Sequence, residues 1–310
     1  MKHIRRITAL LAVPVFICSP TMMAAQPHFG EQGNLHYRDY ELLINPASAG
    51  AADHHLITLG VFKQWAGFES SHSEIIQYQF PVTPTNGLGG WVYNDVFGPQ
   101  RNIQFGAAYA HSLKLGNNRN LSFGLSFSLL RRSERRVENY DPSDPVFTVP
   151  ATGQFGFNAG FGAYYFTDTY YIGFSIPQWL TNELTVEHEK TKLENNFNFE
   201  QLQYYFTGGY RFKISEKINL TPSILAELSK NTTFGYEGVL TATYDNRFEV
   251  GAGLASHTRL LFDFGMAVTK WLSFRYQYAQ YAGSNYHKSN DHFIVVRIHW
   301  NKKIKEQITL

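Results

Sequence analysis

The residues from Ile103 to Leu130 alternate between large apolar and small or polar side chains with a period of two. This period predicts β-strands, because successive side chains of a strand leave opposite faces of the backbone. Gly116-Asn117-Asn118 divides the stretch and tolerates the positive φ of a tight turn, so a hairpin is predicted. Each run is about ten residues long, which is the length with which a tilted strand crosses a bilayer. The apolar positions are Ile103, Phe105, Ala107, Tyr109, Leu113, Leu121, Phe123, Leu125, Phe127 and Leu129.

The same alternation recurs on both sides of this hairpin, interrupted by clusters of turn-forming residues. It predicts about fourteen strands between residues 53 and 300, an even number as in single-chain bacterial outer-membrane barrels. The clearest further strands are 54–63, 73–80, 88–93, 155–166, 170–176 and 292–300. We therefore predict an all-β fold, namely a transmembrane antiparallel β-barrel with short periplasmic turns and longer extracellular loops.

The lengths of the connections support this orientation. If the N-terminus is periplasmic, the longest connections, 131–152, 177–200 and 282–290, all fall at the extracellular end. The shortest turns, 167–169, 215–217 and 245–247, all fall at the periplasmic end. Outer-membrane barrels have this asymmetry.

Composition favours a barrel over a soluble β-sandwich or propeller. The exposed face of a soluble sheet is rich in Lys, Glu and Thr, whereas the less apolar face here is dominated by Gly, Ala and Ser over several strands. Small uncharged side chains fit the crowded interior of a barrel. The mean hydropathy of −0.27 agrees with this, because lipid-facing apolar residues alternate with lumenal polar ones.

The first 25 residues are predicted to be a secretory signal peptide, with a basic start, an apolar centre at 7–17 and a cleavage site after Ala25. The only cysteine, Cys18, lies in it, which excludes disulfides and cysteine-ligated metals from the mature chain. We expect residues 26–52 to form an N-terminal periplasmic segment, 53–300 the barrel and 301–310 a C-terminal tail. On the sequence alone, the N-terminal segment can lie below the barrel or enter it.

The charge of the chain gives no reason to expect a nucleic-acid partner. Loss of the signal peptide removes three basic residues and leaves the mature chain nearly neutral. In the later strands, however, charged residues fall at positions that should face the lumen, where they would form either an ion-selective constriction or ion pairs that fill the interior. We favour ion pairs and a narrow or occluded lumen, because an isolated buried charge is costly. The residues are Arg211, Glu227, Glu237, Glu249, Asp263, Arg275 and Arg297.

The sequence predicts no cofactor, no metal site and no catalytic residues. His54 and His55 are adjacent and face opposite sides of a strand, and the spacing of His287, Asp291 and His292 matches no known ligand pattern. No Ser-His-acid or paired-carboxylate arrangement is assignable, so an outer-membrane hydrolase is an unsupported alternative. The five tryptophans lie mostly near strand ends, which is typical of an interfacial girdle rather than of a sugar-stacking site.

Four arginines cluster at the outer end of the second strand of the hairpin, at Arg131, Arg132, Arg135 and Arg136. They can contact lipid A or sugar phosphates of lipopolysaccharide in the outer leaflet, or they can form the base of a solvated loop. The sequence favours neither interpretation over the other.

Five segments, in order along nearly the whole mature chain, resemble the PorP/SprF family of Bacteroidetes type IX secretion and gliding proteins. They are 43–50 (LINPASAG), 63–68 (KQWAGF), 94–99 (NDVFGP), 163–177 (AYYFTDTYYIGFSIP) and 207–210 (TGGY). The matching positions are Asn45, Pro46, Gly50, Trp65, Gly67, Asn94, Asp95 and Gly98. Ser48, where an aromatic residue is expected, and the tail after Trp300 depart from the family pattern.

The resemblance implies a non-enzymatic protein of the bacterial outer membrane, in contact with lipid and lipopolysaccharide, that works with the other type IX secretion components. It also implies support for the secretion or surface anchoring of a large adhesin, and association with a periplasmic or peptidoglycan-associated lipoprotein. The motif positions would then contact a partner or shape turns, and Pro and Gly favour turns. The alternative function is a passive, porin-like diffusion channel, which composition alone would favour.

Overall fold

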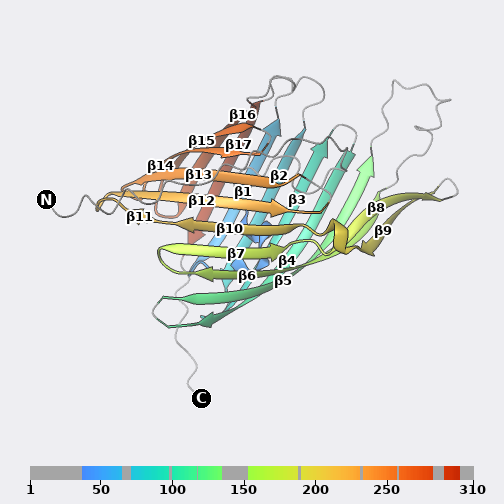
Figure 1. Ribbon diagram of the computed structural model, residues 1–310, viewed down its shortest axis with the longest axis horizontal. Coiled ribbons are helices and arrows are strands. Elements are labelled where there is room, and N and C mark those ends of the chain that lie inside the picture. Colours follow the sequence, from blue (N-terminus) through green and yellow to red (C-terminus); the bar gives the residue numbers. More distant parts are fainter. Residues whose placement is uncertain are drawn as a thin grey trace, which may run out of the picture.

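The computed structural model describes residues 37–64, 71–97, 100–116, 118–134, 153–187, 190–230, 233–256, 258–281 and 290–300. Fourteen antiparallel strands close into a barrel (Figure 1), which confirms the predicted fold class. The first strand, β1 (His55–Gln64), pairs with the last, β17 (Asn290–Trp300). The ring is completed by β10 (Tyr204–Tyr210), which pairs with both β7 (Tyr170–Ile176) and β12 (Ile218–Leu228).

The remaining wall strands pair with their neighbours in chain order. They are β2 (His72–Pro81), β3 (Asn86–Phe97), β4 (Gln100–Lys114), β5 (Asn120–Glu134), β6 (Gln154–Phe166), β13 (Gly235–Tyr244), β14 (Phe248–Ala255), β15 (Arg259–Ala267) and β16 (Leu272–Tyr281).

Other elements do not belong to the ring of wall strands. β8 (Leu180–Glu187) and β9 (Lys190–Phe197) pair with each other in a separate hairpin, and β11 (Phe212–Lys213) adds a short pairing to β12. The helices within the described residues are α1 (Glu41–Ile44), η1 (Pro46–Ser48) and η3 (Phe199–Gln201). In the described ranges no helix combines the length and the apolar character needed to cross a membrane.

The wall is apolar outside and polar inside, as the alternation of the sequence predicts. In the β4–β5 hairpin, Phe105 is 53% exposed and Leu125 is 56% exposed, whereas Gln104 and Ser122 on the opposite face are buried. Many other large apolar side chains are exposed around the ring, among them Val61, Ile172 and Phe262. Such a surface is stable only against lipid, because a soluble protein does not expose an apolar band of this extent.

The two ends of the barrel differ in their connections, as predicted. The turns 167–169, 214–217 and 245–247 close the end at which β1 begins, and the longer connections 135–153, 177–203 and 282–289 lie at the other end. Asp245 and Asn246 both have positive φ, at 52° and 51°, as a two-residue hairpin turn requires. Short turns mark the periplasmic end of an outer-membrane barrel, so the long connections are extracellular.

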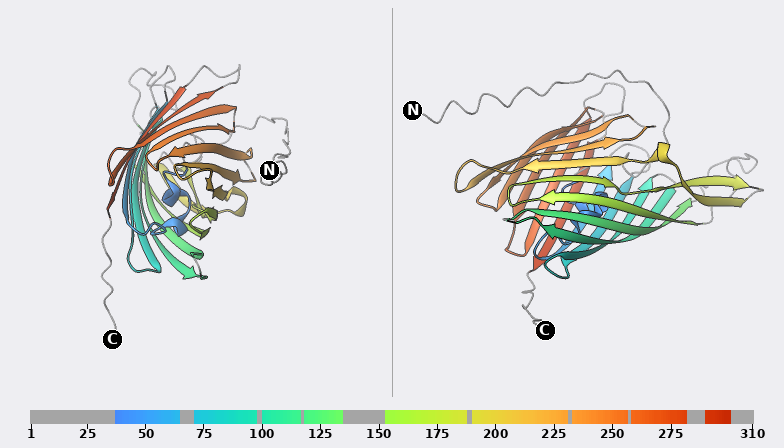
Figure 2. Two further views of the ribbon diagram at one scale, coloured as in Figure 1. Left: turned by 90° about the vertical axis from the view of Figure 1, so that its left-hand side faces the viewer. Right: turned by 60° about the horizontal axis from the view of Figure 1, so that its bottom comes forward.

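The N-terminal residues Tyr37–Gly50, here called the lumenal segment, lie inside the barrel (Figure 2). We expected residues 26–52 in the periplasm, but the structure places residues 37–50 in the lumen instead. The reason is one of size: a fourteen-stranded wall encloses more space than its own side chains fill. Residues 1–36, which include the predicted signal peptide, and the tail 301–310 lie outside the described residues.

Candidate functional site

The lumenal segment takes its shape from Asn45 and the residues that follow it. The Asn45 Oδ1 accepts a hydrogen bond from the Ala47 N–H (3.0 Å), which caps η1, and Pro46 occupies the first turn of that helix. Ser48 Oγ donates to the Asn45 carbonyl oxygen at 2.9 Å. Gly50 ends the segment at φ +68°, a conformation that favours glycine.

Glycines on the inner faces of β3, β5 and β6 make room for this segment. A Cβ at Gly124 would collide with the backbone of Pro46 and Ala47, and one at Gly162 would collide with the Asn45 amide. At Gly89 it would lie 2.7 Å from a methyl group of Leu42. The small-residue face predicted from the sequence is therefore the seat of the lumenal segment.

Hydrogen bonds and apolar packing complete the contacts on this side of the lumen. Asn45 Nδ2 donates to the Ala163 carbonyl oxygen in β6 (3.1 Å). Leu42 and Ala49 pack in one buried cluster with Trp91 of β3. Both contacts depend on shape rather than on charge.

Charged side chains hold the segment on the opposite side of the lumen. Arg38 donates to Thr241 Oγ1 (2.9 Å) and pairs with Asp263 (3.2 Å). Asp39 pairs with Arg275, at 3.4 Å, and with Arg297. Arg275 also pairs with Glu249, and Gln77 Nε2 donates to the Asp39 carbonyl oxygen at 2.6 Å. The Asp39 side chain is 0% exposed, so the two arginines compensate a fully buried charge.

Glu41 adds a titratable group to the segment. Burial raises the pKa of its carboxyl group to about 7, and the hydrogen bond from Tyr164 offsets part of this rise. Its Oε1 is buried with no hydrogen-bond partner among the residues that the structure describes. The seated segment therefore favours protonated Glu41.

Three of the seven predicted lumenal charges contact the segment, namely Asp263, Arg275 and Arg297, and Glu249 is joined to it through Arg275. Glu227 and Glu237 are buried elsewhere in the wall, with Glu227 facing Tyr205, and Arg211 is exposed near the turn 167–169. Sequence reasoning missed Arg38 and Asp39, which join these charges together. Their position, four and five residues before the LINPASAG segment, is the one signal that could have suggested them.

The predicted family-motif positions divide into two groups. Asn45 and Pro46 are buried in the lumen, and Gly50 packs on Gly87. These three residues shape the lumenal segment, and a partner cannot reach them while the segment lies in the barrel. On the outer half of β3, Asn94 accepts a hydrogen bond from Arg101 (2.9 Å) and Asp95 accepts one from Ser73 (2.6 Å). Trp65, Gly67 and Gly98 lie outside the described residues.

The arginines predicted to contact lipopolysaccharide also fall into two groups. Arg131 is exposed and lies over the Phe155 ring, 5.9 Å from its centre, on the lipid-facing side of β5 and β6. Arg132 is turned to the other face, where its Nε donates to Asn102 Oδ1 at 3.1 Å. Arg135 and Arg136 lie outside the described residues.

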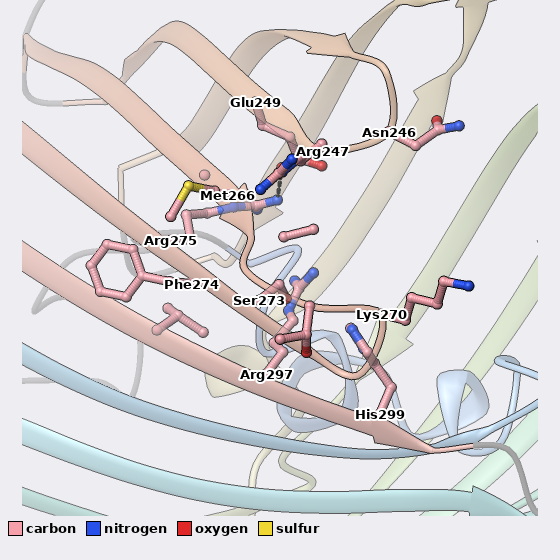
Figure 3. Close-up of a pocket in the computed structure, with 14 residues that line it drawn as sticks. Asn246, Arg247, Glu249, Met266, Lys270, Ser273, Phe274, Arg275, Arg297 and His299 are labelled. Atoms are coloured by element: carbon pink, nitrogen blue, oxygen red, sulfur yellow. Dashed lines mark hydrogen bonds and ion pairs between the residues drawn. The ribbon is translucent and has the colours of Figure 1, made fainter.

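A cavity of about 380 Å³ opens at the periplasmic end, between the turns 245–247 and 268–271 and strands β16 and β17. Figure 3 shows Arg247, Arg275 and Arg297 approaching it from different elements. Its cationic lining residues are Arg247, Lys270, Arg275 and Arg297, and Glu249 is its one carboxylate within the described chain.

The described histidines and tryptophans named below make packing contacts or lie at the membrane interface. His55 stacks between Tyr78, Phe80 and Trp300 at the periplasmic rim, and His292 contacts Tyr276. Trp271 and Trp300 are exposed at the same rim, as in an interfacial girdle, whereas Trp91 is buried inside. No group of three or more metal-ligating side chains occurs in the part of the chain that the structure describes.

Comparison with known proteins gives a family and a fold. The family model of the type IX secretion system membrane protein PorP/SprF matches residues 31–298. No curated protein sequence matches the chain. A TodX deltaS2S3 mutant, a monoaromatic hydrocarbon channel, has a TM-score of 0.53 at 11% identity, over 84% of this chain and 94% of its own. The CymD monoaromatic hydrocarbon channel has a TM-score of 0.50 at 11% identity, over 86% and 92%. The Pseudomonas putida toluene transporter TodX has the same TM-score and identity, over 86% and 94%. At this identity the likeness concerns the fold alone.

Proposed function

Because the chain belongs to the PorP/SprF family of type IX secretion system membrane proteins and is an outer-membrane β-barrel, we propose that it is a non-enzymatic anchor of that machinery. In this role it supports the secretion, or the attachment to the cell surface, of a large adhesin-type cargo, including adhesins used in gliding. It also docks a periplasmic or peptidoglycan-associated lipoprotein.

One observation carries the choice of an anchor over a channel, namely the occupied lumen. The lumenal segment contacts wall strands on both sides of the barrel and is fixed by ion pairs to Asp263, Arg275 and Arg297. A barrel filled in this way offers its two rims to partners, while its interior is engaged by its own chain.

The extracellular connections are the surfaces that we assign to the cargo. The connection 177–203 contains the β8–β9 hairpin, which extends past the wall (Figure 1) and has backbone edges that pair with no wall strand in the described residues. Such a hairpin can pair with an extended segment of a secreted protein. We assign the periplasmic turns, including 245–247 and 268–271, as the contact surface for the lipoprotein.

Affinity purification from gently solubilised membranes tests the anchor. The tagged protein should retain a surface adhesin or a periplasmic type IX component, and a variant without 180–197 should lose the adhesin while it keeps the periplasmic partner. An unrelated tagged outer-membrane barrel from the same cells is the control. A solitary barrel in this experiment would overturn the proposal.

A diffusion channel is the second candidate, and the likeness of the fold to structures described as channels and transporters favours it. It requires a solute path through or around the lumenal segment. Liposome swelling with sugars of increasing size separates the two functions. The anchor predicts swelling rates equal to those of empty liposomes, and a channel predicts a rate that falls with sugar size.

A further inference from the structure

The periplasmic cavity combines a half-open volume with an excess of positive charge. Its four cationic side chains, Arg247, Lys270, Arg275 and Arg297, face one lining carboxylate, Glu249, and the Asp39 carboxylate behind them. Two positive charges are therefore not balanced by these carboxylates. A cleft lined mainly by one sign of charge attracts ligands of the opposite sign.

The surplus charge comes from the rim of the cavity. Arg247 belongs to the turn 245–247 and Lys270 to the turn 268–271, and no ion pair joins either side chain to a carboxylate within the described ranges. Deeper in the lining, Arg297 Nε is buried and has no hydrogen-bond partner among the described residues. The site thus has donors that the protein itself leaves unused, and guanidinium groups bind carboxylate and phosphate oxygens well.

The size of the cavity limits the ligand. A volume of 380 Å³ holds roughly a dozen water molecules at about 30 Å³ each, which suits a small molecule better than a polymer. Because the cavity opens between the short turns, it takes its ligand from the periplasm.

The same two arginines also hold the lumenal segment. Arg275 and Arg297 line the cavity and pair with Asp39. We propose that this cavity binds a small carboxylate- or phosphate-bearing ligand from the periplasm, in competition with Asp39 for Arg275 and Arg297. Two anions that share one pair of cations weaken each other's binding, and this coupling is reciprocal. An occupied cavity therefore loosens the lumenal segment from the wall.

Calorimetric titration of the detergent-solubilised, full-length protein with citrate and with inorganic phosphate tests the proposal, at an ionic strength fixed with chloride. We expect saturable binding of at least one of them. The double variant R247Q/K270Q should weaken it about tenfold, since each partly exposed charge contributes roughly two- to fivefold. Both residues lie on turns, and the mobility of the unheated barrel in a gel verifies that the variant is folded.

The competition is tested separately with a matched pair of variants. Asp39→Asn removes the competing carboxylate and should raise the affinity for the anion several-fold. Asp263→Asn removes the partner of Arg38, which loosens the same segment without altering a cavity-lining residue, and should leave the affinity within twofold. Absence of saturable binding, an unchanged affinity in R247Q/K270Q, or equal effects of the two aspartate variants would overturn the proposal.

Discussion

The two sides of the barrel hold the lumenal segment by different physical means. On the side of β3, β5 and β6, glycines leave space and the contacts are close backbone packing, the Asn45 amide and a cluster around Leu42. On the side of β13 to β17, the contacts are ion pairs of Arg38 and Asp39 with Asp263, Arg275 and Arg297. On the first side the carboxyl group against the wall is Glu41, beside Tyr164. The second side adds the apolar packing of Tyr40 against Phe293 and Val295 to its ion pairs.

This difference assigns separate roles to the two sides. Shape contacts fix where the segment sits, because a backbone atom cannot move aside as a flexible side chain can. Ion pairs fix how strongly it is held under given conditions, because their strength depends on competing ions and on protonation. The position of the segment therefore depends on shape, whereas the strength of its hold on the charged side should vary with salt and pH.

Larger side chains at the glycines that contact the lumenal segment should have the largest effect on how firmly the segment is held. In Gly124→Val combined with Gly162→Val, the new side chains overlap Pro46, Ala47 and Asn45, so the segment is excluded at a cost of more than about 4 kcal/mol. Valine suits a strand, so the wall should persist. Hydrogen exchange of the 38–50 amides should approach the rate of an unprotected chain. Gly238→Val is the control, because a Cβ there meets no atom within 4 Å.

Removal of the Asp39 carboxylate, which lies between the arginines of the charged side, should have the second-largest effect on how firmly the segment is held. Asp39→Asn leaves Arg275 and Arg297 without their shared partner and should weaken the seating by about 3 kcal/mol, the lower end for a broken buried pair. The lower end applies because the Arg297 side chain is still 25% exposed. The same hydrogen-exchange measurement checks this, with exposed Asp245→Asn as the control. Unchanged protection would mean that the ion pairs do not hold the segment.

Protonation of Glu41 should give a smaller effect. Its pKa is raised from 4.5 to about 7, so its contribution to seating is complete below about pH 4.5 and is lost as the pH rises through 7. Protection of the segment should fall by up to about seventyfold between pH 5 and pH 8, as a rise of the pKa from 4.5 to about 7 requires. Glu41→Gln cannot ionise and should remove this part of the pH dependence. A wild-type and variant profile of equal slope would contradict the assignment to Glu41.

The smallest effect concerns the outer rim. Arg131 lies on the lipid-facing side and Arg132 on the other face of the same strand. Arg131→Gln should lower the affinity for purified lipopolysaccharide roughly fivefold, which is about 1 kcal/mol for one arginine at an anionic surface. Arg132→Gln should change it little. Equal losses in both variants would indicate a general charge effect instead of a contact by Arg131.

The wall was predictable from the sequence, and its contents were not. The alternation at 103–130 gives the exposed Phe105 and Leu125 and the buried Gln104 directly, because a strand side chain has only two faces to choose from. The small-residue face indicated a crowded interior, and the glycines are indeed in close contact. The sequence could not show what crowded it, since Pro46 and Gly124 are distant in the chain and no local period connects them.

The charges show the same limit at the level of single residues. Parity in the strands identified Glu249, Asp263, Arg275 and Arg297 as lumenal, but parity has no meaning for the irregular segment that carries Arg38 and Asp39. The ion pairs of Arg38 and Asp39 with the wall became visible only in the structure, which places the segment inside the barrel. Arg247 and Lys270 lie on turns and were not distinguishable from ordinary solvated residues.

Single-channel recording in planar bilayers tests most directly whether the lumen is closed by the protein's own N-terminal segment. The wild-type protein should insert without large, steady conductance, and the Gly124→Val, Gly162→Val variant should form open channels under the same conditions. Large, steady channels in the wild type, or a closed double variant, would contradict the account.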